Sequence, residues 1–189
     1  PEYRAGWQQR LGLCPINNTP TLWIHTVSMG EAVACTPLIE QLCVRYPNHR
    51  ILVTTTTPTG KKHIELKFGS RVTHSYTPYD IPFILKHFIH QHHIQACIIM
   101  ERELWPNIIH TCNNLSLPIL LINARLSERS TQSYKRLGYF ARRMISQIDL
   151  IMAQSEDVAD RFVRLGYARD HIKITGSIKF DITIDEVIT

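Results

Sequence analysis

The residues from Ser28 to Glu31 could carry out acid–base chemistry. Ser28 and Glu31 are three residues apart, Gly30 lies beside the Glu, and an apolar run ends just before them at residue 26. A carboxylate at such a corner can take the proton of a substrate hydroxyl, and a glycine lets the substrate approach the backbone. The same spacing is typical of a capping box, in which Ser and Glu bind free N–H groups at a helix start. From spacing alone, we favour the helix cap.

A run of threonines at residues 54–57 is a second candidate site. Proline follows it, and Gly60 then precedes two lysines. Free N–H groups at a helix start can bind a phosphate or a carboxylate, so we include Thr56, Thr57 and Gly60 among the candidate cleft residues. Capping of the helix by Thr57 is the simpler interpretation. The run is not a phosphate-binding P-loop, because it lacks that motif's first glycine and its final Ser or Thr.

Two clusters farther along combine charge with hydrogen-bonding groups. Glu101 and Glu103 follow an apolar run and precede Trp105. They fit a solvated charge cluster and a functional site about equally well. In the second cluster we favour function, because its side chains supply hydrogen bonds suited to an anionic or hydroxyl-rich ligand. Its members are Asn123, Arg125, Ser127, Arg129 and Ser130.

A repeating pattern of short apolar runs predicts the elements that position these residues. The runs alternate with longer stretches of helical periodicity, and Pro37 marks either a kink in the first of these or a helix start capped by Thr36. Strands that alternate with helices form βαβ units, so we predict an α/β fold whose mostly parallel sheet is covered on both faces. In such sheets ligands bind at the carboxyl ends of the strands, where the clusters fall. The predicted strands are residues 22–26, 51–54, 72–76, 96–100, 119–122, 150–153 and 172–175.

The composition limits the classes of protein that this chain can represent. Its 189 residues, 44% of them hydrophobic, are enough for one substantial domain. The formal net charge of +5 favours an anionic partner without identifying it. Five cysteines without a C-x-x-C pair indicate neither a disulfide framework nor a zinc site, and they fit a reducing cytosol. No apolar run among these residues is long enough to span a membrane, and none has the pattern of a signal peptide; because the chain begins with Pro1 and not Met, we expect that an upstream segment has been removed.

The densest group of histidines comprises His87, His90, His92 and His93. Two of their spacings are three residues and would share a helix face, which makes a metal site conceivable. The apolar residues between them define the buried stripe of that helix, so we expect the histidines on the solvent side and no bound metal. No G-x-G-x-x-G or G-x-S-x-G motif follows a predicted strand, so the fingerprints of dinucleotide binding and of a nucleophile elbow are missing.

Taken together, these clusters resemble the Kdo transferases of lipopolysaccharide synthesis, which move 3-deoxy-D-manno-octulosonic acid (Kdo) from CMP-Kdo to a lipid A precursor. The resemblance covers nearly the whole chain and consists of separate motifs in matching order. They are Tyr3-Arg4 with R-L-G at 10–12, W-I-H at 23–25 with V-S-M-G-E at 27–31, the T-x-T-P-T-G pattern ending at Gly60, Y-x-P-x-D at 76–80, E-x-E-L-W-P-N at 101–107, N-A-R-L-S-E-R-S at 123–130, A-Q-S at 153–155, and T-G at 175–176 with K-F-D at 179–181.

The resemblance implies a two-domain glycosyltransferase of the GT-B type with Rossmann-like domains, no metal or other cofactor, and an amino-terminal membrane anchor. The glutamate after Ser-x-Gly is the proposed base of the family, and it corresponds to Glu31. Glu101 corresponds to the first acid of the E-x-E-L-W-P motif and is expected in the same cleft. Arg102, which is more often Thr in the family, would partly neutralise Glu101.

From the resemblance we expect residues 1–176 to form the acceptor-binding domain and residues 177–189 to begin the linker to a donor-binding domain absent from this chain. Arg4, Trp7 and Arg10 are candidates for contact with a membrane or a phosphate, although their roughly helical spacing fits a covering surface helix equally well. Gly176 and Lys179 would lie on the donor side. The expected partners are CMP-Kdo, mostly through the second domain, a lipid A precursor (lipid IVA) and a membrane surface, with no nucleic acid.

The expected location is the cytoplasmic face of the bacterial inner membrane. Without its anchor and second domain, this chain is expected to be a soluble fragment that lacks transferase activity. Two alternatives stay open: another GT-B transferase with a different nucleotide sugar, and a non-catalytic module that binds anionic glycolipid or nucleic acid. The lack of a concentrated Lys/Arg run argues against nucleic acid.

Overall fold

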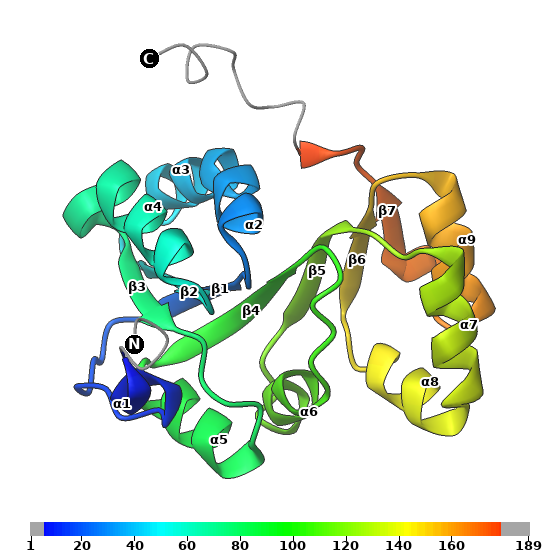
Figure 1. Ribbon diagram of the computed structural model, residues 1–189, viewed down its shortest axis with the longest axis horizontal. Coiled ribbons are helices and arrows are strands. Elements are labelled where there is room, and N and C mark those ends of the chain that lie inside the picture. Colours follow the sequence, from blue (N-terminus) through cyan, green and yellow to red (C-terminus); the bar gives the residue numbers. More distant parts are fainter. Residues whose placement is uncertain (1–5, 179–189) are drawn as a thin grey trace.

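The structure is a computed structural model of the 189-residue chain and describes residues 6–178. Its centre is a seven-stranded sheet in which all neighbouring strands are parallel, in the order β3-β2-β1-β4-β5-β6-β7 (Figure 1). The predicted α/β fold and all seven predicted strands are confirmed, with strand ends that shift by no more than two residues. The strands are β1 (Thr21–His25), β2 (Arg50–Thr55), β3 (Thr73–Tyr76), β4 (Ile94–Met100), β5 (Ile119–Ala124), β6 (Leu150–Ala153) and β7 (Ile172–Ile174).

Helices cover both faces of the sheet (Figure 1). One face carries α2 (Met29–Ala34), α3 (Thr36–Arg45) and α4 (Pro58–Phe68), and the other carries α5 (Pro82–Gln91), α6 (Pro106–Asn114), α8 (Tyr139–Ile145) and α9 (Glu156–Arg164). The short α1 (Trp7–Arg10) packs on β3, and α7 (Glu128–Arg136) packs on α9. Short 3-10 turns at Gly69–Arg71 and Arg169–His171 precede β3 and β7. Within residues 6–178, no helix is both long enough and apolar enough to cross a bilayer.

The core consists of two layers, one on each side of the sheet. Successive strand residues point to opposite faces, so the adjacent Trp23 and Ile24 of β1 belong to different layers. Both side chains are fully buried. The Trp23 ring packs on Phe88 of α5, with 5.2 Å between ring centroids. A strand buried on both faces must be apolar throughout, which is why the sequence shows continuous apolar runs.

The strand order reverses between β1 and β4. After β1 the chain adds β2 and β3 on one side, and it then returns to add β4 to β7 on the other. Adjacent loops therefore leave the carboxyl ends of β1 and β4 in opposite directions and open a crevice, the usual ligand site of an open parallel sheet. Glu31 follows β1 and Glu101 follows β4. The topology alone places the two predicted acids on the two sides of this crevice.

The stretch around Pro37 forms two helices. Helix α2 ends at Ala34, and α3 begins at Thr36 with the proline in its first turn, so Pro37 does mark a new helix start. The predicted cap was wrong, because Cys35 occupies the N-cap position and no side chain caps this helix. The Thr36 hydroxyl instead donates to the Ala32 carbonyl at 3.4 Å, since α2 runs almost directly into α3 and leaves that carbonyl within reach.

The histidine group is split between solvent and core. His87, His90 and His93 are exposed, as predicted, but His92 is buried. Arg50 of β2 donates to the His92 carbonyl at 3.1 Å and places its Nη2 2.9 Å from Nδ1. The solvent-side prediction was wrong for His92 because it follows the last helical turn, where the helical face no longer determines direction.

Candidate functional site

The Glu31 carboxylate folds back onto the chain that enters α2. The Val27 N–H donates to Oε2 at 2.8 Å, and the Ser28 hydroxyl donates to Oε1 at 2.9 Å. The Glu31 N–H donates to Ser28 Oγ at 3.3 Å, so Ser28 also caps the helix. The cap favoured from spacing is therefore present. The cap leaves part of the hydrogen-bonding capacity of the Glu31 carboxylate unused, because each oxygen has a further lone pair that can accept a hydrogen bond from a substrate hydroxyl.

A chain of contacts links this corner to the amino-terminal segment. The Thr56 N–H and Oγ1 both donate to the Val27 carbonyl, at 3.0 and 2.7 Å. Arg10 donates from Nη2 to the Thr56 carbonyl at 2.8 Å, and its guanidinium lies over the Tyr76 ring, 4.7 Å from the centroid. The structure thus brings together Arg10, Thr56 and Glu31 from three separate segments. We call the carboxyl edge of the sheet, with the loops that follow its strands, the rim. A guanidinium held in place at this rim is well suited to binding a phosphate.

The electrostatic surroundings of Glu31 connect it to the loop after β4. Partial burial raises the Glu31 pKa above its ordinary value, and the hydrogen bonds from Val27 and Ser28 oppose part of this rise. The charges of Glu103 and Glu101 raise the pKa further, so the three carboxylates lie within electrostatic reach of one another. A raised pKa makes the Glu31 carboxylate a stronger base.

Glu101 is buried and paired at the other side of the crevice. It directly follows β4 in a left-handed conformation, with φ of 53°, and only 8% of its surface is exposed. Its Oε2 lies 3.5 Å from Nη1 of Arg125, and its Oε1 accepts a long hydrogen bond of 3.4 Å from Asn123 Nδ2. A solvated charge cluster does not describe this position. The residue that neutralises Glu101 is Arg125, and the prediction for the exposed Arg102 was wrong.

Asn123 joins Glu101 to the segment that follows β7. It is 3% exposed and has a φ of 50°. Its Oδ1 accepts from Gln154 Nε2 at 2.7 Å and from the Ile178 N–H at 3.2 Å, so Nδ2 must be the amide atom that faces Glu101. Gln154 also donates to the Asn123 carbonyl at 3.1 Å. Sequence reasoning missed Gln154 and Ile178 as site residues, although the A-Q-S motif contains Gln154.

Glu103 and its neighbours form the third part of the rim. The Glu103 carboxylate accepts a hydrogen bond from the Trp105 indole N–H at 3.0 Å. The Trp105 ring packs edge-on against His25, with 5.0 Å between centroids. Asp80, which comes from the loop after β3, fixes the start of α6 because its Oδ1 accepts from the Ile108 N–H at 2.8 Å. His25 and Asp80 lay within the motifs but were not predicted as site residues.

His25 gives the fold a predictable dependence on pH. The residue is fully buried, and burial lowers its pKa to about 3. Because an unfolded histidine titrates near pH 6.5, the unfolded chain binds a proton below that pH that the folded chain does not bind. Stability is complete above pH 6.5 and is lost as the pH falls toward 3. The same direction holds for His74 and His92, whose pKa values burial lowers to about 3 and about 4.

We expect the free energy of unfolding to fall by about 1 kcal/mol per histidine between pH 6.5 and 5.5, with a steeper slope at lower pH. Urea unfolding at several pH values measures this slope. A His25→Gln variant should lose one histidine's share of the slope, whatever the substitution does to stability at pH 7.5. An unchanged slope in the variant would contradict the assignment of His25 as a buried neutral group.

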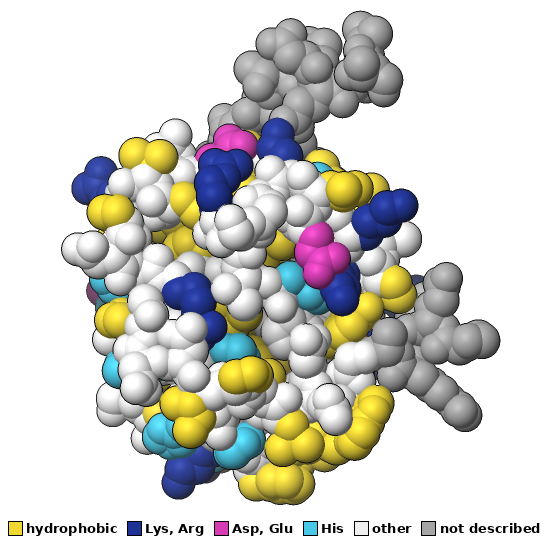
Figure 2. Space-filling view, turned by 90° about the vertical axis from the view of Figure 1, so that its left-hand side faces the viewer, with side chains coloured by type: hydrophobic (Ala, Val, Ile, Leu, Met, Phe, Trp, Pro, Cys, Tyr) yellow, Lys and Arg dark blue, Asp and Glu magenta, His cyan; other side chains and the backbone are white. Residues whose placement is uncertain are grey.

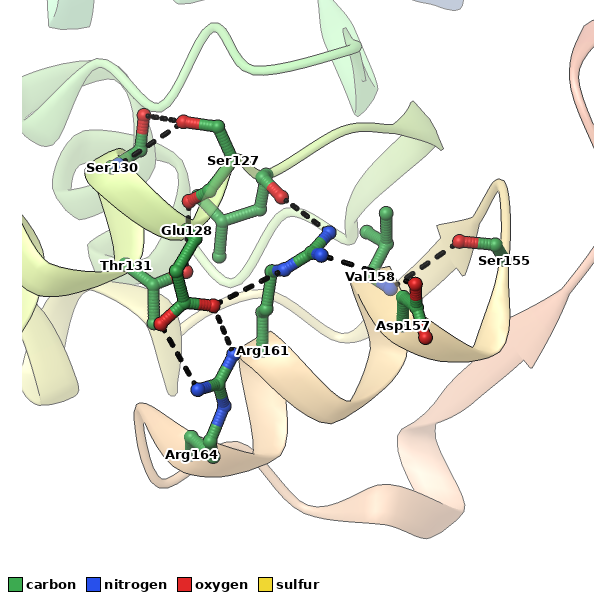
Figure 3. Close-up of polar contacts among 10 residues, drawn as sticks. Ser127, Glu128, Ser130, Thr131, Ser155, Asp157, Val158, Arg161 and Arg164 are labelled. Atoms are coloured by element: carbon green, nitrogen blue, oxygen red, sulfur yellow. Dashed lines mark hydrogen bonds and ion pairs between the residues drawn. The ribbon is translucent and has the colours of Figure 1, made fainter.

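The hydroxyls of Ser127 and Ser130 bond to each other at the start of α7. Ser127 Oγ accepts from the Ser130 N–H at 3.1 Å and lies 2.9 Å from Ser130 Oγ (Figure 3). Beside them, the Glu128 carboxylate receives Arg164 Nη2 at 2.6 Å and lies 3.5 Å from Arg161 Nε, which ties α7 to α9 (Figure 3). These contacts give the two serines a capping role, while their part in acceptor binding stays a prediction.

Thr57, Gly60 and Gly30 at the rim differ in their structural roles. Thr57 caps α4, as predicted, because its Oγ1 accepts from the Gly60 N–H at 3.1 Å. A Cβ on Gly60 would lie 3.0 Å from the Thr55 side chain, so a glycine lets α4 approach β2 closely. At Gly30, by contrast, the nearest atom to an added Cβ would be Ser28 Oγ at 3.8 Å. The space beside Glu31 therefore remains open to another molecule.

The remaining predicted residues lie apart from these contacts or beyond the described chain. Arg129 and Gly176 are exposed, and Trp7 is 56% exposed. Gly176 has a φ of 75°, which a residue with a side chain adopts only with strain. Arg4 and Lys179 lie outside the described residues. Across residues 6–178, no three His, Cys, Asp or Glu side chains form a group that could hold a metal ion.

Sequence comparisons identify the family. Residues 5–182 match the family model of 3-deoxy-D-manno-octulosonic-acid transferase (kdotransferase). The chain is 41% identical over 192 residues to the 3-deoxy-D-manno-octulosonic acid transferase of Haemophilus influenzae, and the match covers 100% of this chain and 45% of that protein. The enzyme of the same name from Bordetella pertussis is 32% identical over 87% of this chain and 39% of its own length. The chain thus spans less than half the length of these curated relatives.

Structural comparisons support the fold. UDP-GlcNAc 2-epimerase from Neisseria meningitidis superposes with a TM-score of 0.64 at 13% sequence identity, over 86% of this chain and 48% of that one. Acinetobacter baumannii MurG gives a TM-score of 0.51 at 10% identity, over 74% of this chain and 42% of its own. These are GT-B enzymes, and the likeness shows the fold of one GT-B domain, as predicted. By its sequence motifs and its family match, the chain belongs to the 3-deoxy-D-manno-octulosonic-acid transferase family.

Proposed function

We propose that this chain is the acceptor-binding half of an enzyme that transfers Kdo from CMP-Kdo to a lipid A precursor, with Glu31 as the general base. One observation carries the proposal: the Glu31 carboxylate lies at the crevice between β1 and β4, within electrostatic reach of Glu101 and Glu103. Its pKa is raised by burial, and the Gly30 backbone beside it is open. Family membership supports a sugar-nucleotide donor and a glycolipid acceptor, and the surroundings of Glu31 support its role as the base.

The proposed step balances without a cofactor. Glu31 takes the proton of an acceptor hydroxyl as the hydroxyl oxygen forms a bond to the anomeric carbon of Kdo. The bond from that carbon to the phosphate oxygen breaks, and CMP leaves with the bonding electron pair. Arg125 and Arg10 are the cations best placed to bind anionic groups of the acceptor, because each is held at the rim by a contact. For Arg10, its fixed position favours the phosphate role over membrane contact.

The domain assignment rests on the length of the relatives, of which this chain covers less than half. Residues 177–189 are proposed to begin the linker to a donor-binding domain, and Ile178 already contacts Asn123 at the crevice. Gly176 and Lys179 are proposed for the donor side. The remaining cleft candidates, Ser28 and Thr56 among them, are proposed for the acceptor. For the full-length protein we propose the cytoplasmic face of the inner membrane.

We expect the 189-residue chain alone to bind CMP more weakly than about 1 mM, because most of the nucleotide site belongs to the other domain. Isothermal titration calorimetry measures this affinity. The full-length protein should transfer sugar from CMP-Kdo to lipid IVA and from no other nucleotide sugar, as followed by mass spectrometry of the lipid. Tight CMP binding by this chain would overturn the domain assignment. Transfer from a different donor would replace CMP-Kdo, and lipid binding without transfer would favour a non-catalytic module.

A further inference from the structure

A cavity lies between the amino-terminal segment and the amino-terminal end of the sheet. Its volume is about 390 Å³, within the usual range for small-molecule sites, and its walls come from residues 8–17, β3, Arg50 and His92. Arg50 is the first residue of β2, and His92 lies two residues before β4. At roughly 3.3 Å per strand residue, Arg50 lies about 16 Å from Thr55 at the rim end of β2. We call this space the amino-end cavity, and it is separate from the crevice.

Arg50 brings a positive charge to the amino-end cavity without a carboxylate partner. Its Nε donates to Thr21 Oγ1 at 3.2 Å, and its Nη2 lies 3.1 Å from the His92 carbonyl and 2.9 Å from Nδ1. Within residues 6–178, Nη1 has no hydrogen-bond partner, and no carboxylate lies within ion-pair distance of Arg50. Because this partly buried charge is balanced only by neutral groups, an external anion would stabilise it.

The contact with Arg50 also determines where His92 carries its proton. A guanidinium only donates, so Nδ1 is the acceptor and the neutral ring has its proton on Nε2. His92 is 5% exposed, and Nε2 is buried without a hydrogen-bond partner in the described part of the chain. The Phe88 ring, 4.5 Å away between centroids, has no lone pair to offer. The wall of the cavity therefore contains an unpaired buried N–H, whose dipole favours a negative charge nearby.

Two side-chain amides of the amino-terminal segment add further unpaired donors. Gln9 Oε1 accepts from the Tyr76 N–H at 3.0 Å, and Asn17 Oδ1 accepts from the Thr19 N–H at 2.8 Å. Because a backbone N–H only donates, these contacts identify the oxygen of each amide and leave its NH2 group as the free end. Neither NH2 group has a partner among residues 6–178, and no described residue that lines the cavity is Asp or Glu. The unused groups of the guanidinium, the imidazole and both amides are thus all donors.

We propose that the amino-end cavity binds a small phosphate ester, whose phosphate accepts from Arg50 Nη1 and from the amides of Gln9 and Asn17. A phosphate presents three terminal oxygens and suits donors that come from separate segments, and arginine is the side chain best matched to it. His92 is a positioning residue, because it occupies Nη2 and leaves Nη1 for the ligand. The cavity is larger than a phosphate group and is also lined by Leu13, so it has room for an organic body.

A ligand in the amino-end cavity would join the amino-terminal segment to the sheet. Arg10, the neighbour of Gln9, donates to the Thr56 carbonyl at the rim, so the bound ester would help to hold Arg10 in place. Figure 2 views the molecule from the side where β3 and α1 lie in Figure 1, and Lys and Arg predominate over Asp and Glu among its charged side chains. This charge favours the approach of an anion. The inference goes beyond the proposed function, because neither Glu31 nor the transferred sugar takes part.

The test is an NMR titration of the nitrogen-15-labelled 189-residue chain with glucose 6-phosphate at constant ionic strength. We expect millimolar affinity and shifts of the side-chain N–H signals of Arg50, Gln9 and Asn17. Inorganic phosphate should shift the same signals at higher concentration, because it lacks the organic body. Glucose and acetate should leave them unchanged. Equal affinity for inorganic phosphate would overturn the preference for an ester, and equal affinity for acetate would overturn the phosphate assignment.

Two variants test the donors separately. Arg50→Gln should raise the Kd about 10-fold or more, the usual effect of losing a hydrogen bond to a charged group. Asn17→Asp keeps the oxygen that accepts from the Thr19 N–H and replaces the free NH2 with a negatively charged oxygen, so it should weaken binding at least as much. The matched controls are Arg45→Gln and Asn113→Asp, which make the same changes of charge at exposed positions outside the cavity.

Circular dichroism melting curves confirm that each variant is folded, and Asn17→Asp keeps the test valid if the loss of Arg50 disturbs packing. The proposal is overturned if the ester leaves the Arg50 and Asn17 signals unshifted, or if the cavity variants bind it as well as the controls do. Glu31→Gln in the same chain should bind the ester with unchanged affinity. A failure of this proposal is therefore distinguishable from a failure of the proposed base, which is tested by transfer alone.

Discussion

Replacing Glu31 with Gln in the full-length enzyme is expected to lower the transfer rate by ~10²–10⁴-fold, the usual contribution of a general base. Gln has nearly the shape of Glu but cannot take the acceptor proton. The fold should survive, because the Gln carbonyl can accept from the Val27 N–H while its amide donates to Ser28 Oγ. The substitution also removes a charge whose burial raises its pKa, so we expect little loss of stability.

The control for this experiment is Ser28→Ala, which removes the helix cap and leaves the carboxylate. It should cost about 1 kcal/mol of stability, as N-cap replacements do, and it should reduce the rate less than Glu31→Gln, because it removes hydrogen bonds to the carboxylate and the acceptor but leaves the base itself. The two variants separate the two roles of this corner, because a purely structural Glu31 would give a Glu31→Gln rate no lower than that of Ser28→Ala. Transfer by the Gln variant within a few-fold of the unchanged enzyme would leave Glu31 as a capping residue only.

The pH profile gives the Glu31 prediction an independent readout. A base must be ionised to act, so the rate should fall as the pH drops through the Glu31 pKa. Because burial and the charges of Glu103 and Glu101 raise that pKa, the fall should begin at higher pH than for an ordinary glutamate. In the Gln variant, the residual rate should lose this acidic limb. Rates of both enzymes across a pH series measure the difference.

The layout of the rim could be predicted from the sequence because it depends on local patterns. Apolar runs identified the strands, and the residues after each run were placed at the carboxyl edge by the parallel topology alone. The cap formed by Ser28 was equally local, since it depends on a spacing of three residues. In each case the relevant physics lies within one turn or one strand, where sequence neighbours are also spatial neighbours.

The pairing of side chains across the rim could not be predicted, because it depends on contacts between distant segments. Sequence proximity suggested Arg102 as the partner of Glu101, but the ion pair is made by Arg125, which follows the neighbouring strand β5. His92 is bound by Arg50, which reaches it from β2. Gln154 belongs to the site only through Asn123, which lies 31 residues earlier. No pattern of polar and apolar residues in the sequence shows which distant segments contact each other.

The contact between Asn123 and Glu101 leads to the second large expected effect. In an Asn123→Asp variant, an oxygen replaces Nδ2 and faces Glu101 Oε1 from about the same 3.4 Å. Both side chains are buried, and Arg125 already pairs with Glu101, so an added carboxylate there is neither solvated nor provided with a counter-charge of its own. We expect a loss of ~3 kcal/mol in the free energy of unfolding at pH 8, similar to the cost of leaving a buried charge unpaired. Transfer by the full-length enzyme should fall with it.

This loss should depend on pH in a direction that identifies its cause. One proton shared between the two carboxyls relieves their repulsion, and the folded variant therefore binds a proton more tightly than the unfolded one. Its stability deficit should shrink as the pH is lowered from 8 to 5, which urea unfolding can measure. Asn123→Gly is the matched control, because glycine accepts the φ of 50° and removes the amide without adding charge. Its deficit should stay constant over the same pH range.

The double variant Glu101→Gln with Asn123→Asp completes the cycle. Its Gln amide can donate to the new Asp, so the contact is restored with donor and acceptor exchanged and one negative charge in total, as in the original pair. We therefore expect the double variant to be more stable at pH 8 than Asn123→Asp alone, a coupling that only residues in direct contact show. If the double variant is as unstable as the sum of the two single ones, Asn123 acts through Gln154 and Ile178 and not through Glu101. Transfer activity then distinguishes the role of the Asn123–Glu101 contact from the role of the Glu101 charge. If the ionised Glu101 is needed in the crevice, the double variant should recover stability without recovering transfer.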